Sequence, residues 1–302
     1  MAERTKQTKE AKPAGNLESL MNRAETLMTR IEEFLPAARP QPDWTALAWR
    51  WQHNNGRGYL EAVPHPHRIK LDDLKNVDEQ KKIIVRNTEQ FVHGYTANNV
   101  LLTGARGTGK SSLVKALLSK FSKDGLRIVE VDKHDLIDLP KITSFLRSRE
   151  ERFIVFCDDL SFEEGDAGYK ALKVVLDGSV SVTSDNIVVY ATSNRRHLVP
   201  EYMAENLQTQ HVGEEIRPGE TVEEKISLSD RFGIWLSFYS FDQDEYITIV
   251  EQWLNHYGVK NFTDEVRGAA LQWALARGSR SGRSAHQFAR DYAGRIALAS
   301  KR

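Results

Sequence analysis

Eight consecutive residues at positions 104–111, Gly-Ala-Arg-Gly-Thr-Gly-Lys-Ser, have the spacing of a phosphate-binding loop. The glycines at 104 and 109 let the backbone turn tightly, so that successive N–H groups point at one place. Lys110 is expected to reach the outer phosphates of a nucleotide, and Ser111 is expected to bind magnesium. The residues expected around the phosphates are Gly104, Ala105, Arg106, Gly107, Thr108, Gly109, Lys110, Ser111 and Ser112.

Two carboxylates, Asp158 and Asp159, follow the apolar run Phe-Ile-Val-Phe-Cys. The first of them lies 48 positions after Lys110. A P-loop ATPase needs a carboxylate on a neighbouring strand to hold the magnesium shell, and Asp158 is placed for that role. Asp159 beside it is expected to polarise the attacking water. Polar residues are common at strand ends, so the two aspartates indicate a magnesium site only because a phosphate-binding loop precedes them in the sequence.

Asn194 ends the next apolar run, Asn-Ile-Val-Val-Tyr-Ala-Thr-Ser. An amide at this place is expected to orient the water that attacks the γ-phosphate. The alternative is an asparagine in an ordinary turn. The order of the loop, the aspartates and this amide along the chain favours the functional interpretation.

Arginines downstream offer positive charge for a phosphate chain. Arg231, in Leu-Ser-Asp-Arg-Phe-Gly, is interpreted as a residue that reaches the nucleotide of a neighbouring subunit, and the alternative is a surface arginine paired with Asp230. Arg283, at the start of the last predicted helix, is expected to reach the γ-phosphate. Arg280 competes with it for that role.

Alternating strands and helices must position these residues. Continuous apolar runs separated by helical patterns predict a parallel sheet covered on both faces. Strands are predicted at 99–104, 127–131, 153–159, 186–193 and 233–238, and helices at 109–121, 135–148 (with Asp135 as its cap) and 166–177. Residues 44–240 therefore form the predicted nucleotide-binding α/β domain, and three helices at 242–257, 263–277 and 283–299 make 241–302 a helical lid domain.

The N-terminal segment is predicted to lie outside this domain. Residues 1–15 are interpreted as a disordered tail, and 16–43 as an amphipathic helix, capped by Asn16, followed by a proline-rich linker. The apolar face of the helix runs along Leu17, Met21, Ala24 and Met28. It is expected to pack on its own domain or a neighbouring subunit, or to dock a partner. Trp44, Trp49 and Trp51 are expected to pack against the main domain, and His65 and His67 to lie in a solvated loop.

Composition bounds the class of protein. The 302 residues carry 42 basic and 42 acidic side chains, so the net charge gives no support to a general nucleic-acid binder. The single cysteine, Cys157, lies in an apolar run and is interpreted as an inert core thiol. The polar N-terminus and the lack of a run of about 20 apolar residues predict a cytoplasmic protein without a membrane partner.

The ordered motifs resemble a family of bacterial ATPases of the AAA+ superfamily that carry a domain of unknown function. The segments that carry the resemblance are GARGTGKSSLVKALL, FCDDLSFEEGD, YATSNRRHLVPE and EEKISLSDRFG, and the match covers roughly residues 45–300. The resemblance implies a five-stranded parallel sheet in the order 5-1-4-3-2, then a helical lid, with ATP and Mg²⁺ between them and assembly into a ring. It assigns Walker A to Gly104–Ser111 and the Walker B magnesium residue to Asp158.

The same resemblance gives roles to four further residues. Asn194 is similar to sensor 1, Arg231 to the arginine finger and Arg283 to sensor 2, and Val77, in the segment 71–80, is a candidate contact of the adenine. One departure affects catalysis, because most AAA+ ATPases have Asp-Glu where this chain has Asp158-Asp159. The shorter side chain suggests slow hydrolysis, or assistance from Glu163 or Glu164.

Three functions follow from these interpretations. The first is an ATP hydrolase that acts between subunits of a homo-oligomer to remodel a partner macromolecule. The second is a nucleotide-gated binding module with little turnover, which the Asp-Asp pair favours. The third is a DNA-associated AAA+ protein of the helicase-loader or initiator kind, for which Arg195, Arg196 and the lysine-bearing tail are the only support.

Overall fold

A computed structural model describes residues 14–34, 41–54, 56–162, 166–177, 185–194, 210–212, 215–217 and 230–299. The contacts divide the chain into two compact units, Met1–Gln41 with Asn54–Arg57, and Pro42–His53 with Gly58–Arg302. The predicted proline linker (35–40), Glu163, Glu164, Arg195 and Arg196 lie outside the described residues. Among the described helices none is long and apolar enough to span a membrane.

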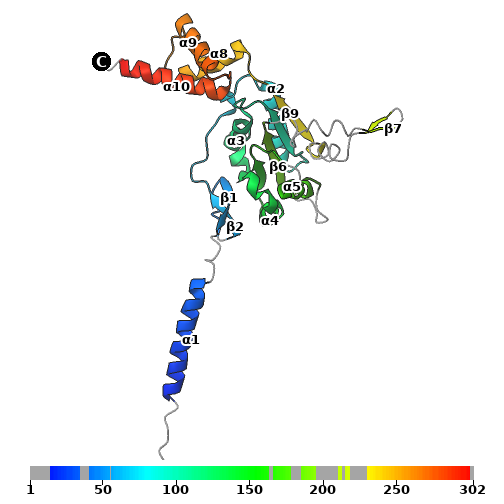
Figure 1. Cartoon of the computed structure of the whole chain (residues 1–302), viewed down its shortest axis with the longest axis vertical. Helices are drawn as coiled ribbons and strands as arrows, with labels where there is room; N and C mark the ends of the chain where they lie inside the picture. The colour runs from blue at the N-terminus through cyan, green and yellow to red at the C-terminus, as the bar shows by residue number, and fades with distance from the viewer. Residues whose placement is uncertain are drawn as a thin grey trace, which may run out of the picture. The chain divides into compact units, whose positions relative to one another are not determined.

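The first unit contains one long helix, α1 (Ala14–Phe34) (Figure 1). The predicted cap was wrong, because the helix begins two residues before Asn16 and includes Ala14 and Gly15 of the predicted tail. Alanine is the best helix former, and the segment 14–34 contains no proline to stop the helix. The side chains of Leu20, Met21, Leu27 and Met28 on the apolar face are 59–67% exposed.

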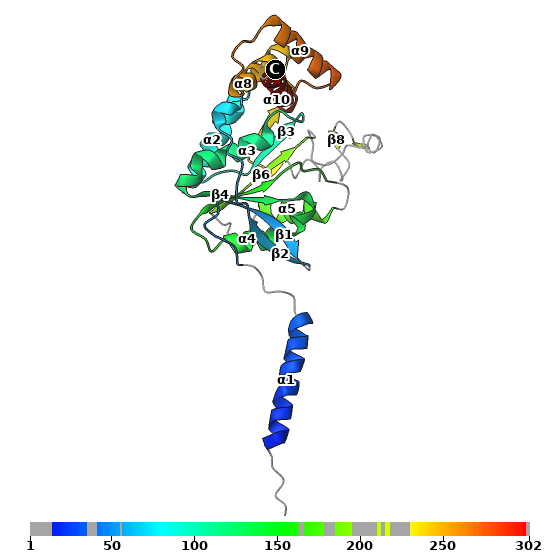
Figure 2. The same ribbon diagram turned by 90° about the vertical axis from the view of Figure 1, so that its left-hand side faces the viewer.

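The second unit is built on a seven-stranded sheet, in the order β2-β1-β4-β5-β6-β3-β9 (Figure 2). Its five strands from β9 to β4 have the predicted order 5-1-4-3-2, and all neighbours among them are parallel. The strands are β1 (Ala48–Asn54), β2 (Arg57–Ala62), β3 (Val100–Gly104), β4 (Leu126–Val131), β5 (Arg152–Cys157), β6 (Ile187–Ser193) and β9 (Ile234–Phe238).

Two strands at the edge of the sheet, β1 and β2, were not predicted. β1 pairs in parallel with β4, and Val63 N donates to Ala48 O on the β2 side. Trp49 and Trp51 of β1 are fully buried, which confirms that the tryptophans pack against the main domain. The segment therefore extends the hydrophobic core past the five central strands.

Helices cover both faces of the sheet. α2 (Asp78–Val92) and α3 (Lys110–Phe121) contribute to one apolar cluster, which includes Ile84 and Leu117. α4 (Leu139–Leu146) and α5 (Ala167–Asp177) contribute to the other, which includes Ile142 and Leu172. Burial of each apolar face is the main driving force that fixes these helices to the sheet.

The helix predicted over 135–148 was wrong at its start. Residues Lys133–Asp138 form a 3₁₀ segment whose cap is Asp132, which accepts a hydrogen bond from His134 N at 3.1 Å. α4 starts only at Leu139, with Pro140 in its first turn. Proline has no N–H to donate to the carbonyl four residues back, so the α-helical hydrogen bonds cannot run through from Asp135.

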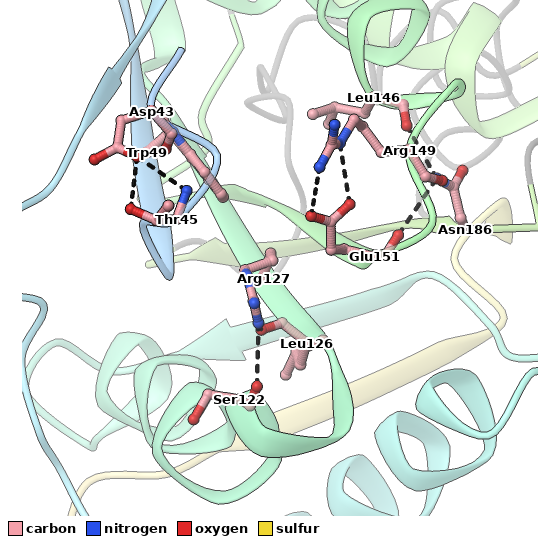
Figure 3. Close-up of polar contacts among 10 residues, drawn as sticks. All are labelled: Asp43, Thr45, Trp49, Ser122, Leu126, Arg127, Leu146, Arg149, Glu151 and Asn186. Carbon is pink, nitrogen blue, oxygen red and sulfur yellow. Dashed lines mark hydrogen bonds and ion pairs between the residues drawn. The ribbon is translucent and has the colours of Figure 1, made fainter.

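Side-chain hydrogen bonds and an ion pair connect the loops at the N-terminal end of β5 (Figure 3). The Asn186 amide donates to Leu146 O and Arg149 O, both at 2.9 Å, and Arg149 binds Glu151 at 2.7 Å. The Arg149 guanidinium also lies 4.6 Å from the centre of the Trp44 ring. These contacts hold the start of β5 and β6 together, so the opposite ends of the same strands are held in register.

Three helices form the C-terminal part of the unit and lie together at one end of the sheet domain (Figures 1 and 2). They are α8 (Gln243–His256), α9 (Asp264–Ala276) and α10 (Gly282–Ala299), each within one residue of its predicted start. Asp242 and Glu245 form a capping box at α8, and Thr263 caps α9. The three helices have their own apolar core around Tyr246.

A short antiparallel pair of strands, β7 (Gln210–Val212) and β8 (Glu215–Arg217), was not predicted.

Candidate nucleotide-binding site

The glycine-rich loop joins β3 to α3 at the carboxyl edge of the sheet. Gly104 has a φ of 126°, and a Cβ there would lie 1.8 Å from Phe238 O, so only glycine fits beside β9. Gly107 and Gly109 also have positive φ, at 75° and 97°. Gly109 caps α3, so the N–H groups of the first helical turn lack helical partners and are directed at the loop. This backbone has the geometry that a phosphate-binding loop requires, and its binding of phosphate stays a prediction.

Lys110 is held across the loop by three oxygen atoms. Its Nζ donates to Gly104 O and Ala105 O, both at 2.7 Å, and to Asn194 Oδ1 at 3.1 Å. Burial of the ammonium group lowers the pKa of Lys110 to about 8, against the opposing effect of Asp159 and Asp158. The lysine therefore lies between the loop and the end of β6, the place where an outer phosphate would meet both.

Asp158 lies at the centre of a short hydrogen-bond network. Ser111 Oγ and Thr192 Oγ1 each donate to its Oδ1 at 2.6 Å. The Thr192 hydroxyl in turn accepts from Asp159 N at 2.9 Å. The sequence analysis did not find Thr192, because only the register between β5 and β6 brings its hydroxyl to Asp158.

Asp159 is bound by two of the predicted site residues. Asn194 Nδ2 donates to its Oδ1 at 2.5 Å, and Arg106 Nη2 lies 3.9 Å from its Oδ2. The backbone of Asp159 has a φ of 53°, in the left-handed region that aspartate and asparagine tolerate better than most residues. The two groups expected to handle water therefore lie in direct contact with each other.

A cavity of about 610 Å³ opens in front of this network. It has the size of a small-molecule site, and both polar and apolar side chains line it. The predicted residues that line it are Val77, Arg106, Gly107, Thr108, Gly109, Lys110, Ser111, Ser112, Asp158, Asp159, Asn194 and Arg283. Gly104 and Ala105 are not among the described residues that line it, but their carbonyls accept hydrogen bonds from Lys110, which does line it.

Two of the arginines are placed differently from Arg283. Arg231 forms an ion pair with Asp177 of α5, and it is not among the described residues that line the cavity. Arg280 is exposed and is likewise absent from that lining, so Arg283 is the better placed of the two competing arginines. The roles of Arg231 and Arg283 stay predictions.

The helical domain contributes five further residues to the lining of the cavity, and none of them was predicted from the sequence. They are Phe241, Ile249, Trp253, Gly282 and His286. Gly282 N donates to Gly107 O at 2.8 Å, so the start of α10 is bonded directly to the phosphate-binding loop. Gln252 Nε2 also donates to Asp73 O at 3.1 Å. Aromatic residues at helical spacing gave no signal, because the same spacing is typical of a helix core.

The donor set of the loop fits a magnesium ion bound together with a nucleotide. Ser111 Oγ and Asp158 Oδ1 are hard oxygen ligands that already lie side by side at 2.6 Å. Magnesium is usually bound by one or two carboxylates with phosphate oxygens and water, and not by a cage of protein ligands. The described residues contain no cluster of three or more His, Cys, Asp or Glu side chains that could hold a metal ion.

Cys157 is the residue that precedes this network on β5. It is fully buried, and burial raises the pKa of its thiol to about 12. Such a thiol stays protonated and unreactive at neutral pH. This agrees with the inert core thiol expected from the sequence.

The fold and the loop together define the class of the protein. A mostly parallel α/β sheet with a glycine loop after β3, followed by C-terminal helices, matches the AAA+ fold of RuvB. The Thermotoga maritima RuvB Holliday junction branch migration motor superposes with a TM-score of 0.51 at 15% identity, covering 77% of this chain and 66% of that one. A mutant of the same RuvB gives a TM-score of 0.54 at 16% identity, over 77% and 67% of the two chains.

The match of the sequence to a family model identifies the family of the chain. The chain belongs to the family described as Protein of unknown function (DUF815), whose model matches residues 44–296. No curated protein matches the chain. At 15–16% identity the likeness to RuvB concerns the fold alone.

Proposed function

We propose that this protein binds ATP with Mg²⁺ and hydrolyses it. The observation that carries the proposal is the meeting of three groups at one edge of the sheet: the glycine loop with Lys110, the Ser111–Asp158 pair, and the Asp159–Asn194 pair. The residues follow the ends of three strands, β3, β5 and β6, and together they face one cavity. A glycine turn that binds no ligand would not require Ser111, Asp158, Asp159 or Asn194 beside it.

Binding of the triphosphate is assigned to the loop. Its backbone N–H groups and the first turn of α3 donate to the phosphate oxygens, which the helix dipole also favours. Lys110 exchanges its bonds with Gly104 O, Ala105 O and Asn194 Oδ1 for phosphate oxygens. Ser111 and Asp158 are the residues that would hold Mg²⁺, which neutralises charge on the β- and γ-phosphates when it is bound.

Hydrolysis is assigned to Asp159 and Asn194. The Asn194 amide orients a water molecule, and Asp159 accepts its proton as the water oxygen bonds to the γ-phosphorus. The bond between that phosphorus and the oxygen bridging to the β-phosphate breaks, so ADP and inorganic phosphate leave. Arg283, which lies beside Gly107, stabilises the charge from the helical domain.

Assembly is the next step of the proposal. Arg231 lies outside the lining of its own cavity, so we assign it to the nucleotide of a neighbouring subunit in a homo-oligomer. Turnover would then move the helical domain against the loop, through the Gly282–Gly107 bond, and remodel a partner macromolecule. DNA as that partner is supported by the arginines and the lysine-bearing tail seen in the sequence, and by the fold likeness to a Holliday junction motor.

A second function, a nucleotide-gated module with little turnover, is favoured by one observation. Asp159 is one methylene shorter than glutamate, and its carboxylate is already bonded to the Asn194 amide. A water molecule would have to separate this pair before attack. Under this alternative, ATP sets the position of the helical domain and hydrolysis is incidental.

Phosphate release by the purified protein tests the proposal. Wild type is expected to release phosphate from ATP in the presence of Mg²⁺, and Lys110→Ala is expected to lose nearly all of that release, by about 100-fold. The rate per subunit is expected to rise with protein concentration because the sites are shared. Equal rates for wild type and Lys110→Ala would rule out hydrolysis at this site, and tight ATP binding with no turnover at any concentration would favour the gated module.

A further inference from the structure

The helix α1 carries an apolar seam with the spacing of a coiled coil. Leu20, Ala24 and Leu27 are separated by four and then three residues, and the sequence keeps this spacing over residues 17–34. These are the a and d positions of a heptad repeat, which lie along one side of a helix. The methionines that follow Leu20 and Leu27 occupy e positions, so the seam consists of positions a, d and e.

This seam is exposed on the described part of the helix. The exposed fraction is 59–67% for its four long side chains, Leu20, Met21, Leu27 and Met28. A helix in water draws most of its stability from the packing of its apolar face. Intrinsic propensity adds little here, because α1 contains Asn22 and Thr26, which are poor helix formers. We therefore expect another surface to cover the seam.

Opposite charges lie on the two sides of the seam. Arg23 and Arg30 occupy g positions, next to the leucines at d, whereas Glu25 occupies a b position, next to the methionines at e. All three side chains are exposed. The residues three and four positions from Arg23 are Ser, Leu, Thr and Leu, so α1 itself offers this arginine no acidic neighbour at helical spacing.

A second copy of α1 that runs in the same direction complements both sides at once. In a parallel pair the g side of one helix faces the e and b side of the next, so Arg23 lies opposite Glu25 of the next copy, about 3 Å further along the axis. In an antiparallel pair the g positions face each other, and arginine would lie opposite arginine. The charges therefore favour parallel packing.

A membrane surface fits this helix less well. α1 contains two arginines and four glutamates, which gives it a net charge of −2. Helices that lie on membranes carry an excess of Lys and Arg on their polar face, which attracts anionic lipid headgroups. The acidic balance of α1 opposes such binding.

We propose that copies of this chain associate through a parallel, in-register bundle of their α1 helices. The proposal goes beyond the proposed function, because association through α1 requires no nucleotide. A parallel bundle has cyclic symmetry, which is compatible with the sharing of sites between neighbouring subunits. The family model begins at residue 44, so this contact lies outside the matched domain.

Sedimentation equilibrium of the full chain without nucleotide tests the proposal. The double variant Leu20→Glu/Leu27→Glu places two charges in the seam, and its dissociation constant is expected to rise at least about 100-fold. The double variant Ser19→Glu/Thr26→Glu is the matched control, because it makes the same charge change at c positions on the opposite side of α1. Its dissociation constant is expected to stay within about threefold of the wild-type value.

Oxidative crosslinking tests the direction of the helices. In a parallel, in-register bundle the Leu20 positions of neighbouring copies meet, so Leu20→Cys is expected to form a disulfide between chains. Ser19→Cys, at a c position, is expected to form none. The native Cys157 does not compete, because it is buried and burial raises the pKa of its thiol to about 12.

Three results would overturn the proposal: a wild type that is monomeric at every concentration, equal association of the two double variants, or crosslinking of Leu20→Cys no faster than that of Ser19→Cys. A monomeric wild type that loses thermal stability on Leu20→Glu/Leu27→Glu would place α1 against its own chain, and would overturn the proposal as well. None of these measurements uses a nucleotide, so such results leave the proposed ATP hydrolysis standing.

Discussion

At the scale of single residues, Lys110 has the most unusual environment in the site. Its ammonium group is bonded to three neutral oxygens, and burial lowers its pKa to about 8. The cavity thus holds the lysine near the point where it loses its charge. A bound polyphosphate would favour the protonated form and draw a proton onto the lysine.

Nucleotide affinity is therefore expected to fall as the pH rises through 8. Below this pKa the free protein already carries the charge, and above it each binding event must take up a proton. Between about pH 7.5 and about pH 9 the loss is expected to be about tenfold, measured as the Kd for Mg²⁺-ADP. Lys110→Arg is the control, because a guanidinium stays protonated over this range. A pH-independent Kd in wild type would contradict this account of the lysine.

The site residues show where sequence reasoning succeeds. Lys110, Ser111 and Asp158 lie in short motifs whose spacing is set by one loop and one strand end, so the sequence alone predicts that they lie together, and all three line the cavity. Thr192, Trp253 and His286 reach the site only through strand register and helix packing. Nothing within a few residues of these positions separates them from ordinary core residues.

At the scale of elements, the central strands were predictable and the edge strands were not. β3 to β6 are continuous apolar runs buried on both faces, which is the pattern of a parallel sheet. β1 mixes buried tryptophans with exposed Arg50 and His53, and β2 contains Gly58 packed against Trp51. The sequence of such a segment fits a loop packed against the core as well as it fits a strand.

The junction of β3 with β9 is expected to tolerate no side chain at Gly104. Gly104→Ala would place a Cβ 1.8 Å from Phe238 O, a backbone atom of the paired strand that cannot turn away. The cost is expected to be about 3 kcal/mol or more, from strain at positive φ together with overpacking. Urea denaturation followed by circular dichroism measures it.

Gly125 provides the matched control for that substitution. It also has a positive φ, of 87°, but a Cβ there would meet nothing within 4 Å. Gly125→Ala is therefore expected to show only the backbone strain, about 1–2 kcal/mol. Similar losses for the two variants would mean that the close approach to β9 is not what requires glycine at Gly104.

At the scale of the whole molecule, a backbone hydrogen bond joins the helical domain to the loop, from Gly282 N to Gly107 O. Ser281 lies at the same junction, 2.8 Å from where a Cβ on Gly107 would stand. Under the proposed function, we expect a change in the loop on binding phosphate to be passed to the start of α10 through this junction. The position of Arg231 outside the cavity raises the separate question of how neighbouring chains contribute to one site.

Mixing two inactive variants is expected to restore turnover if sites are shared between chains. Lys110→Ala removes the lysine of its own cavity, and Arg231→Ala removes the arginine assigned to the neighbouring one. In a random mixture, about one quarter of the interfaces combine an intact lysine with an intact arginine, so phosphate release is expected to reach about one quarter of the wild-type rate.

The control is a mixture of Lys110→Ala with the double variant Lys110→Ala/Arg231→Ala, in which no interface has both groups and no activity should return. A first mixture that stays at the average of its two inactive components would show that Arg231 does not act across an interface. Its ion pair with Asp177 would then be its whole role, as a link between α5 and the segment before β9. Because the two single variants carry intact copies of different groups, only contact between chains explains recovery.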